Sequence, residues 1–418
     1  MKRRQRIAII GAGTAGLAAS IVLARQGHDI TLFEKVDALA PVGAGLLLQP
    51  AGMAVFHHLG ALPHAMDLGA PVDALQGWVK DGLLLNSRYT ESNQSCAASS
   101  FGLGMHRAAL CEVLVAQLAP YAVRYVMASD VTKVTDCGDL TQLEATVDGE
   151  RIADDFDLVL VANGARSTLR PASWTRLDEP YPWGAVWAIV PETTALDYRV
   201  LHQFFHGSSK MMGLLPTGTT SQHGGQQLTS LFWSLPIERI DAWLAAPSGG
   251  FDGWHDEVDA LWPRAGEWIR NHIHSPSQFM PARYRDVVMR KFGENRLGVI
   301  GDAAHAMSPQ LGQGANMALL DAWAIGQAFA ASEDYQRFWA RYHQLRQPSI
   351  RFYQSMSRML TPFYQSHSRS TGVLRDMSFR WMYRLPWLRQ HMAATISGVK
   401  TSPLGEMSLE MIRQSRHR

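Results

Sequence analysis

The first 33 residues alternate between apolar runs and a helical pattern. Residues 7–10 form an apolar run, and residues 14–26 carry apolar side chains at helical spacing. A second apolar run, residues 30–33, follows directly. A strand, a tight turn, a helix and a second strand are therefore predicted, which is the pattern of a βαβ unit.

The pattern changes in the middle of the chain. Four apolar or alternating segments, separated by turn residues, predict strands: residues 181–190, 200–205, 211–215 and 228–235. Residues 75–80 form another candidate strand. Residues 241–268 have helical spacing and four tryptophans, which we interpret as packing residues. The change from a βαβ pattern to a strand-rich pattern predicts a second domain.

Two glycine-rich motifs follow predicted strands at opposite ends of the chain. The first is Gly11-Ala12-Gly13-Thr14-Ala15-Gly16, after the first strand. The second is Gly301-Asp302-Ala303-Ala304-His305, after a strand predicted at residues 296–300. It continues through Pro309 and Gly312-Gln313-Gly314-Ala315-Asn316 into an apolar helix predicted from residue 317 to about residue 331.

The glycines of the first motif have separate tasks. Gly11 permits the turn, Gly13 lets backbone amides approach a pyrophosphate, and Gly16 lets the helix pack closely on the strand. The helix N-terminus faces the phosphates with its partial positive charge. Glu34, eighteen residues after Gly16, can accept hydrogen bonds from an adenosine ribose. The expected cofactor contacts of this region are Gly11, Gly13, Thr14, Ala15, Gly16, Glu34 and Lys35.

The segment GDAAHAMSPQLGQGANMALLD, residues 301–321, resembles the second flavin motif of the class A flavoprotein monooxygenases, typified by para-hydroxybenzoate and salicylate hydroxylases. The resemblance implies that Asp302 binds the ribityl chain of FAD and that Pro309 lies beside the isoalloxazine ring. It also implies that a helix starting near Gly314 points at the N1 and O2 edge, where reduced flavin carries negative charge. Gly312, Gln313, Ala315 and Asn316 are further implied cofactor contacts, whereas His305 is expected to be structural.

Other segments resemble the same family. Residues 157–167 are similar to its middle motif, although Asn163 stands where the family usually has Asp. The resemblance implies that Arg107 reaches the flavin from a helix and that Val131 makes a backbone contact with adenine. Residues 43–50 resemble the loop and strand under the flavin ring, where Gly45 would give the ring room.

The fold implied by the resemblance is α/β, a Rossmann-like FAD-binding domain of the para-hydroxybenzoate hydroxylase type with a smaller β-sheet substrate domain and a C-terminal helical segment. The expected FAD-binding domain is discontinuous and comprises residues 1–72, 100–178 and 283–335. The expected substrate domain comprises residues 73–99 and 179–282. Residues 336–418 are expected to form the C-terminal helical region. The implied reaction uses NADPH or NADH to reduce FAD, which reacts with O2 to a C4a-hydroperoxide that hydroxylates an electron-rich carbon. Water must be excluded from that step.

The substrate pocket is expected to be mainly apolar, with few polar anchors. The predicted strands carry seven possible wall residues, of which alternation lets only about half face the flavin: Trp183, Trp187, His202, Phe204, His206, Met212 and Leu214. Four of these are nominated for the substrate pocket: Trp187, Phe204, Met212 and Leu214. His202 and His206 are candidate catalytic bases for a phenolic substrate. Residues 183–190 contain no cation that could hold a substrate carboxylate, which favours an uncharged or larger apolar substrate. Together with the resemblance, this predicts an aromatic or polycyclic apolar substrate.

Several alternatives share this fold. Baeyer–Villiger oxidation and epoxidation use the same flavin intermediate and differ in product. A halogenase would need a Trp-x-Trp-x-x-Pro motif, which the sequence lacks, and a reductase would turn over without O2. A non-catalytic FAD-binding protein would bind FAD without oxidising NAD(P)H.

Composition narrows the remaining functions. The chain has 418 residues and a net charge of +2, which gives no reason to expect a nucleic-acid partner. Its three cysteines, at 96, 111 and 137, have no metal-type spacing, and no His-Glu-x-x-His motif is present. No metal is therefore expected. No apolar run is long enough to cross a membrane, and a cytoplasmic enzyme is predicted.

Charge is concentrated at the C-terminal end. From residue 340 onward the chain has 13 Lys or Arg and 3 Asp or Glu, and residues 375–389 interleave arginines with bulky apolar residues. Such a segment could lie on an anionic membrane surface as a weak peripheral contact. Alternatively, it packs on the flavin domain or forms an oligomer face. A monomer or a homodimer is expected.

Overall fold

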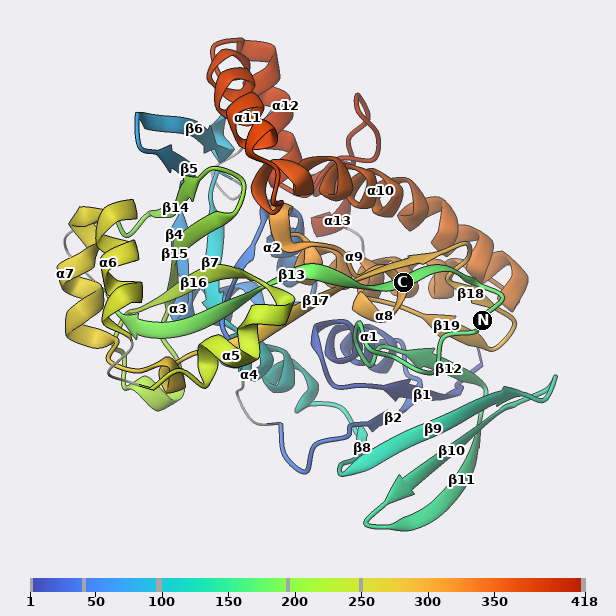
Figure 1. Cartoon of the computed structure of the whole chain (residues 1–418). Helices are drawn as coiled ribbons and strands as arrows, with labels where there is room; N and C mark the ends of the chain where they lie inside the picture. The colour runs from blue at the N-terminus through green and yellow to red at the C-terminus, as the bar shows by residue number, and fades with distance from the viewer. Residues whose placement is uncertain (1–2, 40–42, 95–99, 193–195, 248–250, 415–418) are drawn as a thin grey trace.

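The computed structural model describes residues 3–39, 43–94, 100–192, 196–247 and 251–414 (Figure 1). Cys96, Arg416 and Arg418 lie outside the described residues. The chain forms two large sheets, with helices between and around them and a helical C-terminal part. The predicted α/β fold is confirmed by the element order and by the fold comparisons given below.

The six-stranded sheet contains the βαβ unit predicted at the start of the chain. Parallel pairing joins β1 to β2 and β12, with Ile7 opposite Ile30 and Leu158. Their inner positions are mostly apolar and buried, because the sheet is covered by helix α1 and by an antiparallel sheet of residues 129–156 that contacts β1, β2 and β12. The order is β18-β19-β12-β1-β2-β8. The bounds are β1 Arg6–Ile10, α1 Thr14–Arg25, β2 Asp29–Phe33, β8 Arg124–Val126, β12 Leu158–Val161, β18 Gly293–Glu294 and β19 Leu297–Val299.

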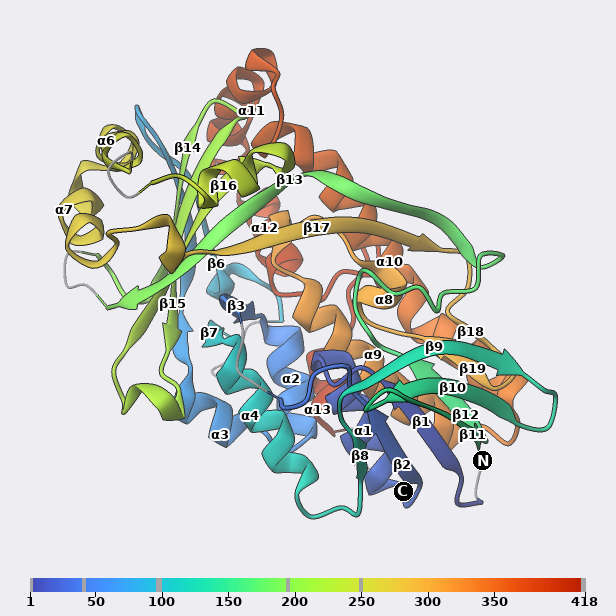
Figure 2. The ribbon, with the colours of Figure 1, turned by 60° about the horizontal axis from the view of Figure 1, so that its bottom comes forward.

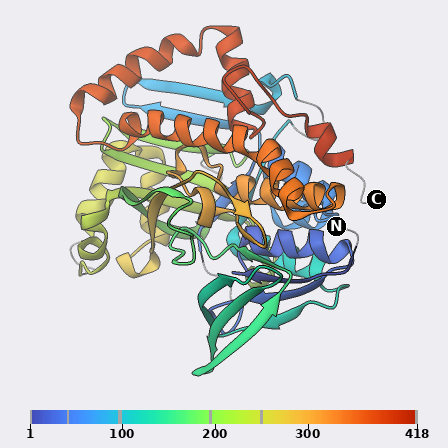
Figure 3. The same cartoon turned by 90° about the vertical axis from the view of Figure 1, so that its right-hand side faces the viewer.

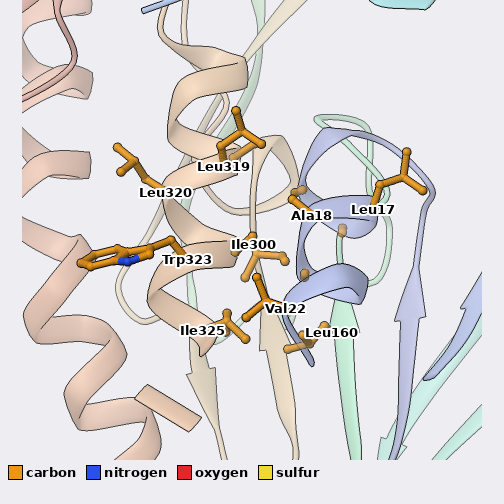
Figure 4. Packing of buried hydrophobic residues seen from close by; sticks show 14 of the residues in the cluster. Leu17, Ala18, Val22, Leu160, Ile300, Leu319, Leu320, Trp323 and Ile325 are labelled. Carbon is orange, nitrogen blue, oxygen red and sulfur yellow. The ribbon is translucent and has the colours of Figure 1, made fainter. Parts of the chain in front are cut away.

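Helices α1 and α9 (Gly314–Ala331) pack against each other over this sheet. Figure 4 shows Ala18 and Val22 of α1 directed toward Leu319 and Ile325 of α9. A Cβ atom at Gly326 would overlap with Val22 Cγ1, so glycine permits the close approach of the two helices. The N-terminal motif and the helix of the late motif therefore share one core.

The seven-stranded sheet contains all the strands predicted in the middle of the chain, in the order β17-β13-β16-β15-β14-β5-β6. Strands β13 and β17 are long and extend from this sheet toward the six-stranded sheet (Figure 2). The bounds are β5 Ala74–Val79, β6 Gly82–Arg88, β13 Thr175–Pro191, β14 Val200–His206, β15 Lys210–Gly218, β16 Leu228–Pro236 and β17 Met280–Met289.

One face of this sheet, here the outer face, is covered by α5 (Ile240–Leu244), α6 (Asp252–Leu261) and α7 (Pro263–His272). The predicted packing role of the four tryptophans is confirmed, because all of them belong to the cluster between these helices and the sheet: Trp243, Trp254, Trp262 and Trp268. The opposite face, here the inner face, carries the candidate site.

Smaller elements connect the two large sheets. β3 (Gly45–Leu48), β7 (Gly102–His106) and β4 (Ala70–Val72) form a three-stranded sheet beside the inner face. The remaining elements of this part are α2 Pro50–His58, α3 Leu62–Leu68, α4 Arg107–Leu118 and the antiparallel strands β9 Ser129–Asp136, β10 Thr141–Val147 and β11 Glu150–Phe156.

The C-terminal part consists of α10 (Tyr335–Tyr364), α11 (Arg369–Met382), α12 (Pro386–Ile396) and α13 (Leu409–Gln414). Figure 3 shows these helices, orange to red, along one side of the molecule, with the later ones over the pale blue hairpin of β5 and β6. Among the helices of the described residues, none has the length and apolar character needed to cross a membrane.

Candidate flavin and substrate site

The three motif segments meet in space. A Cβ atom at Gly301 would lie 2.7 Å from Ala15 Cβ, and Gly301 has a φ of +62°. A Cβ atom at Gly11, whose φ is +101°, would lie 2.7 Å from Asn163 Cα. Both glycines thus combine a left-handed backbone with a close approach that no side chain allows. Segments far apart in the sequence converge at the start of α1.

The N-terminus of α1 is open to a ligand. Gly13 precedes the helix, no side chain caps it, and its first turn contains no acidic residue. Nothing lies within 4 Å of the position that a Cβ atom at Gly13 would take, whereas one at Gly16 would overlap with Gly11 O. Uncapped N–H groups beside free space fit a bound diphosphate.

Glu34 stands at the end of β2, beside this turn. Its Oε2 accepts a hydrogen bond from Ala12 N at 2.7 Å, which fixes the carboxylate next to the motif. The Glu34 carbonyl accepts from Ser129 N at 2.8 Å and so brings the start of β9, with Val131, to the same edge. Lys35 is exposed and pairs with Asp130 at 3.2 Å. Each carboxylate oxygen of Glu34 retains capacity to accept from a ribose hydroxyl.

A buried carboxylate holds the late motif. Asp321 accepts from Gly301 N at 2.8 Å, from His305 Nε2 at 2.6 Å and from Arg346 Nε at 2.7 Å. Burial alone would raise the pKa of Asp321, but His305 and Arg346 outweigh it and hold that pKa well below its usual range. His305 is therefore structural, as expected, and Asp302 is left exposed at the start of α8 (Asp302–His305).

The N-terminus of α9 lies beside Asp302. A Cβ atom at Gly314 would be 3.7 Å from Asp302 Oδ1, and no side chain caps the helix. The side chain of Asn316 accepts from Gln49 N at 2.8 Å, and Gln313 Nε2 donates to Ile396 O at 2.9 Å. Those two side chains are engaged with the protein, so the helix start offers backbone N–H groups to a ligand.

Strand β3 connects the start of α9 with the seven-stranded sheet. On one side Leu47 O accepts from Asn316 Nδ2 at 3.2 Å, and on the other Gly45 N donates to Ser230 Oγ at 2.9 Å. A Cβ atom at Gly45 would overlap with Thr217 Cγ2. The space that Gly45 leaves is thus taken by Thr217, and the glycine serves the contact between β3 and the sheet.

The middle of the inner face carries one row of aligned residues: Gln203 is opposite Gly213, Gly213 opposite Phe232, and Phe232 opposite Trp187. We call these four residues the central row. The rings of Trp187 and Phe232 are 5.0 Å apart. Trp187, Ile189 and Gln203 are only half-buried, while the alternate positions of β13 are buried under the helices of the outer face. Within the central row, Trp187 and Gln203 are therefore partly accessible, whereas Gly213 and Phe232 are buried.

Two polar groups adjoin the central row. Trp187 Nε1 donates to Tyr284 Oη at 3.3 Å. Burial raises the pKa of Tyr284, and the positive charge of Arg107 acts on it in the opposite sense. Arg107, the first residue of α4, is exposed, and a Cβ atom at Gly43 would lie 2.7 Å from its Cδ. The hydrogen bond to Trp187 places the Tyr284 phenol beside the central row.

Only one of the four nominated pocket residues lies on this inner face, namely Trp187. Phe204, Met212 and Leu214 lie in the cluster under α6 and α7, where Phe204 stacks on Trp262 at 3.5 Å between ring centroids. Strand alternation alone could not decide which set faced inward. The sequence analysis did not nominate Tyr284, Phe232 or Gln203. They could have been found from the same strand alternation if the other set of alternate residues had been assigned to the inner face.

The two nominated histidines do not reach the central row. His202 lies 5.7 Å from the Trp262 ring on the outer face, with Nε2 3.3 Å from Asp197 O, and burial lowers its pKa. His206 is exposed at the end of β14, opposite Lys210. Across the described residues, no cluster of three or more His, Cys, Asp or Glu side chains could hold a metal ion.

A family model described as an FAD binding domain matches residues 4–351. The chain belongs to this family. The matched residues include all three motif segments, the central row and Tyr284.

Known members resemble the chain over most of its length. The 3-amino-4-hydroxybenzoate 2-monooxygenase of Streptomyces cremeus is 29% identical over 356 residues, which cover 82% of this chain and 83% of that protein. The kynurenine 3-monooxygenase of Salinispora arenicola is 26% identical over 376 residues, covering 83% and 77%. The structure of p-nitrophenol 4-monooxygenase PnpA from Pseudomonas putida superposes with a TM-score of 0.76 at 15% identity, covering 94% and 97%, and shows the shared fold.

These relatives establish the class of the protein. The chain is an FAD-dependent monooxygenase of the aromatic-hydroxylase type. The matched region contains the uncapped N-termini of α1 and α9.

Proposed function

We propose that the protein uses NADPH or NADH and O2 to hydroxylate an aromatic or polycyclic apolar substrate. Bound FAD would supply the redox chemistry, taking electrons from NAD(P)H and delivering one oxygen atom of O2. The observation that carries this proposal is the convergence of two uncapped helix N-termini, those of α1 and α9, with a half-open aromatic face on the sheet joined to α9 by β3.

The residues of the flavin region have distinct tasks in this proposal. The N–H groups around Gly13 hold the diphosphate, Glu34 binds the adenosine ribose, and Asp302 binds the ribityl chain. Pro309 and the N-terminus of α9 adjoin the ring, where backbone N–H groups at Gly314 stabilise negative charge. A set of further contacts completes the site: Gly11, Thr14, Ala15, Gly16, Lys35, Arg107, Val131, Gly312 and Ala315. Gln313 and Asn316 fix the helix start through their side chains.

The substrate would lie between the central row and the flavin ring. Trp187 and Phe232 offer ring faces for stacking, worth about 1 kcal/mol beyond burial. The indole N–H of Trp187 donates to Tyr284 Oη, which leaves the phenol hydrogen free to donate to a substrate oxygen or nitrogen. Burial raises the pKa of Tyr284, so the phenol stays neutral and remains a donor. Apolar walls also keep water from the reacting atoms.

Turnover of a substrate panel tests this function. The FAD-loaded protein is mixed with NADPH or NADH and with phenols, quinolones or quinones under ¹⁸O2. We expect at least one compound to stimulate NAD(P)H oxidation and to gain one labelled oxygen atom, with little hydrogen peroxide released.

Three results would contradict the proposal. Product formed without O2 indicates a reductase, and product that requires halide indicates a halogenase. Firm FAD binding without NAD(P)H oxidation for any compound of the panel indicates a non-catalytic flavoprotein. A labelled lactone or epoxide would keep the monooxygenase class but replace hydroxylation.

A further inference from the structure

Helices α11 and α12, here the C-terminal hairpin (residues 369–396), expose unusually large apolar side chains. Met377 is 64% exposed, Trp381 68% and Trp387 57%. Val373, Leu374 and Leu385 are exposed beside them in the sequence. In Figure 1 the hairpin stands at the top of the molecule, beyond β5 and β6. Two tryptophans with more than half of their surface in water mark an interaction surface.

The exposed apolar face of α11 is separate from the face that packs. At 3.6 residues per turn, Val373, Leu374, Met377 and Trp381 fall within an arc of about 100°. The opposite side of α11 is buried: Phe379 belongs to a cluster on the inner end of the sheet with Phe205, Met211 and Phe232. The hairpin therefore packs on the sheet through the face that carries Phe379. The face that carries Val373, Leu374, Met377 and Trp381 has no packing partner among the described residues.

The exposed face is basic. Arg380 and Arg384 are exposed beside Trp381, and the Arg384 guanidinium lies 4.9 Å from the Trp381 ring centroid. The one acidic residue of the hairpin, Asp376, is bound by the buried Arg375. The outward side of the hairpin therefore presents arginine and large apolar groups without a free carboxylate of its own.

We propose that the exposed face of the C-terminal hairpin docks on an anionic lipid surface, with α11 lying in the plane of the interface. Tryptophan and arginine side by side suit a membrane interface, where the ring enters the headgroup region and the guanidinium meets lipid phosphate. A second copy of this chain is the competing occupant. A two-fold contact through this face would bring Arg380 and Arg384 of both copies together, and like charges oppose it.

The inward side of the hairpin lies close to the proposed substrate pocket, so membrane docking could deliver substrate to it. This part of the inference rests on the proposed function. Phe379 packs in the same cluster as Phe232, a residue of the central row, and Trp187 adjoins that cluster. Lipid-facing residues of α11 are thus separated from the central row by one layer of side chains. An apolar aromatic substrate concentrated in the lipid would be close to the pocket that we propose.

Vesicle binding tests the docking without turnover. The full-length, FAD-loaded protein is sedimented with phosphatidylcholine vesicles that contain or lack phosphatidylglycerol. We expect binding to the anionic vesicles only, weakened by salt, with a blue shift of tryptophan emission. The double variant Trp381→Ser with Trp387→Ser should abolish the shift. It should also lower the affinity for anionic vesicles at least about tenfold, because two large apolar side chains no longer enter the lipid. Arg380→Glu with Arg384→Glu should lower it about 25-fold or more.

The matched control carries the same kinds of change far from the hairpin. Leu140→Ser with Arg151→Glu alters exposed residues of the β9–β11 sheet, at the opposite end of Figure 1, and should bind vesicles like the parent. Retained flavin absorbance shows that each variant is folded.

Equal vesicle binding by the hairpin variants and the control overturns the proposal, and so does equal binding of the parent to neutral and anionic vesicles. A dimer in solution that the tryptophan variant converts to monomer, without vesicle binding by the parent, assigns the face to a second copy. Failure of the hydroxylation assay leaves each of these readouts intact.

Discussion

The proposed flavin region, which comprises residues 11–16, 157–167 and 301–321, is built from other kinds of contact than the proposed substrate face, which is the inner face of the seven-stranded sheet. In the flavin region the contacts involve the backbone: Gly301 N donates to the Asp321 carboxylate, and Gly16 lies so close to Gly11 that an added Cβ atom would overlap with Gly11 O. On the central row the contacts are between side chains: the rings of Trp187 and Phe232 are tilted by 42° with centroids 5.0 Å apart, and Trp187 donates a hydrogen bond to Tyr284.

Because of this difference, mutations in the two regions should have different consequences. A change in the flavin region alters backbone geometry that every substrate shares, so it should cost folding and FAD together. A change on the central row alters a surface that side chains define, so it should affect which substrate is bound and how well oxygen transfer is coupled. The comparison predicts large, general effects for the first region and small, selective effects for the second.

The largest effect is expected at Asp321. Asp321→Asn leaves Arg346 buried without its counter-charge and should lower the free energy of unfolding by about 3–5 kcal/mol. Urea unfolding at pH 7 measures this loss. The folded-state pKa of Asp321 is depressed, so its contribution is present above the unfolded value near 4 and is lost as pH falls below it. The variant should therefore show a flatter loss of stability in acid than the parent.

An exposed carboxylate provides the control for Asp321. Asp130→Asn breaks the surface pair with Lys35 and should cost less than about 1 kcal/mol. Similar losses for the two variants would show that the buried cluster does not hold the late motif.

A smaller but still general effect is expected at Gly16. A Cβ atom there overlaps with Gly11 O, so Gly16→Ala must displace α1 from the turn and should cost about 1–3 kcal/mol. FAD should be lost on gel filtration, measured as flavin absorbance per protein. Gly253→Ala is the control, because no atom lies within 4 Å of the added methyl group. Full FAD retention by Gly16→Ala would show that the close approach of α1 to the turn is not needed for FAD binding.

The same difference explains what the sequence could predict. The turn at Gly11, the helix after it and Asp302 belong to local motifs in which glycine and acidic residues occupy fixed positions, and the structure brings these segments together. The strands of the second sheet were also predicted, but their facing was not. Phe204 and Trp187 occupy equally apolar, alternating strands, and only the packing of α6 and α7 on one side decides which of them faces the flavin region.

The selective effect is expected at Tyr284. Tyr284→Phe removes the hydrogen bond from Trp187 Nε1, so the free energy of unfolding should fall by about 1 kcal/mol. It also removes the phenol proposed to donate to the substrate, so kcat/KM for the best substrate should fall about fivefold. Since burial raises the pKa of Tyr284 above its usual value near 10, the parent should show no change in kcat/KM from this group below about pH 10.

A second tyrosine of the same sheet region supplies the matched control. Tyr198 donates to Leu228 O at 2.6 Å and has no contact with the central row, so Tyr198→Phe should lower stability by a similar amount and leave kcat/KM unchanged. If Tyr198→Phe changed substrate preference and Tyr284→Phe changed only stability, the central row would not be the substrate site. The substrate would then have to bind nearer to Tyr198 than to Tyr284, because each variant removes one phenol oxygen and nothing else.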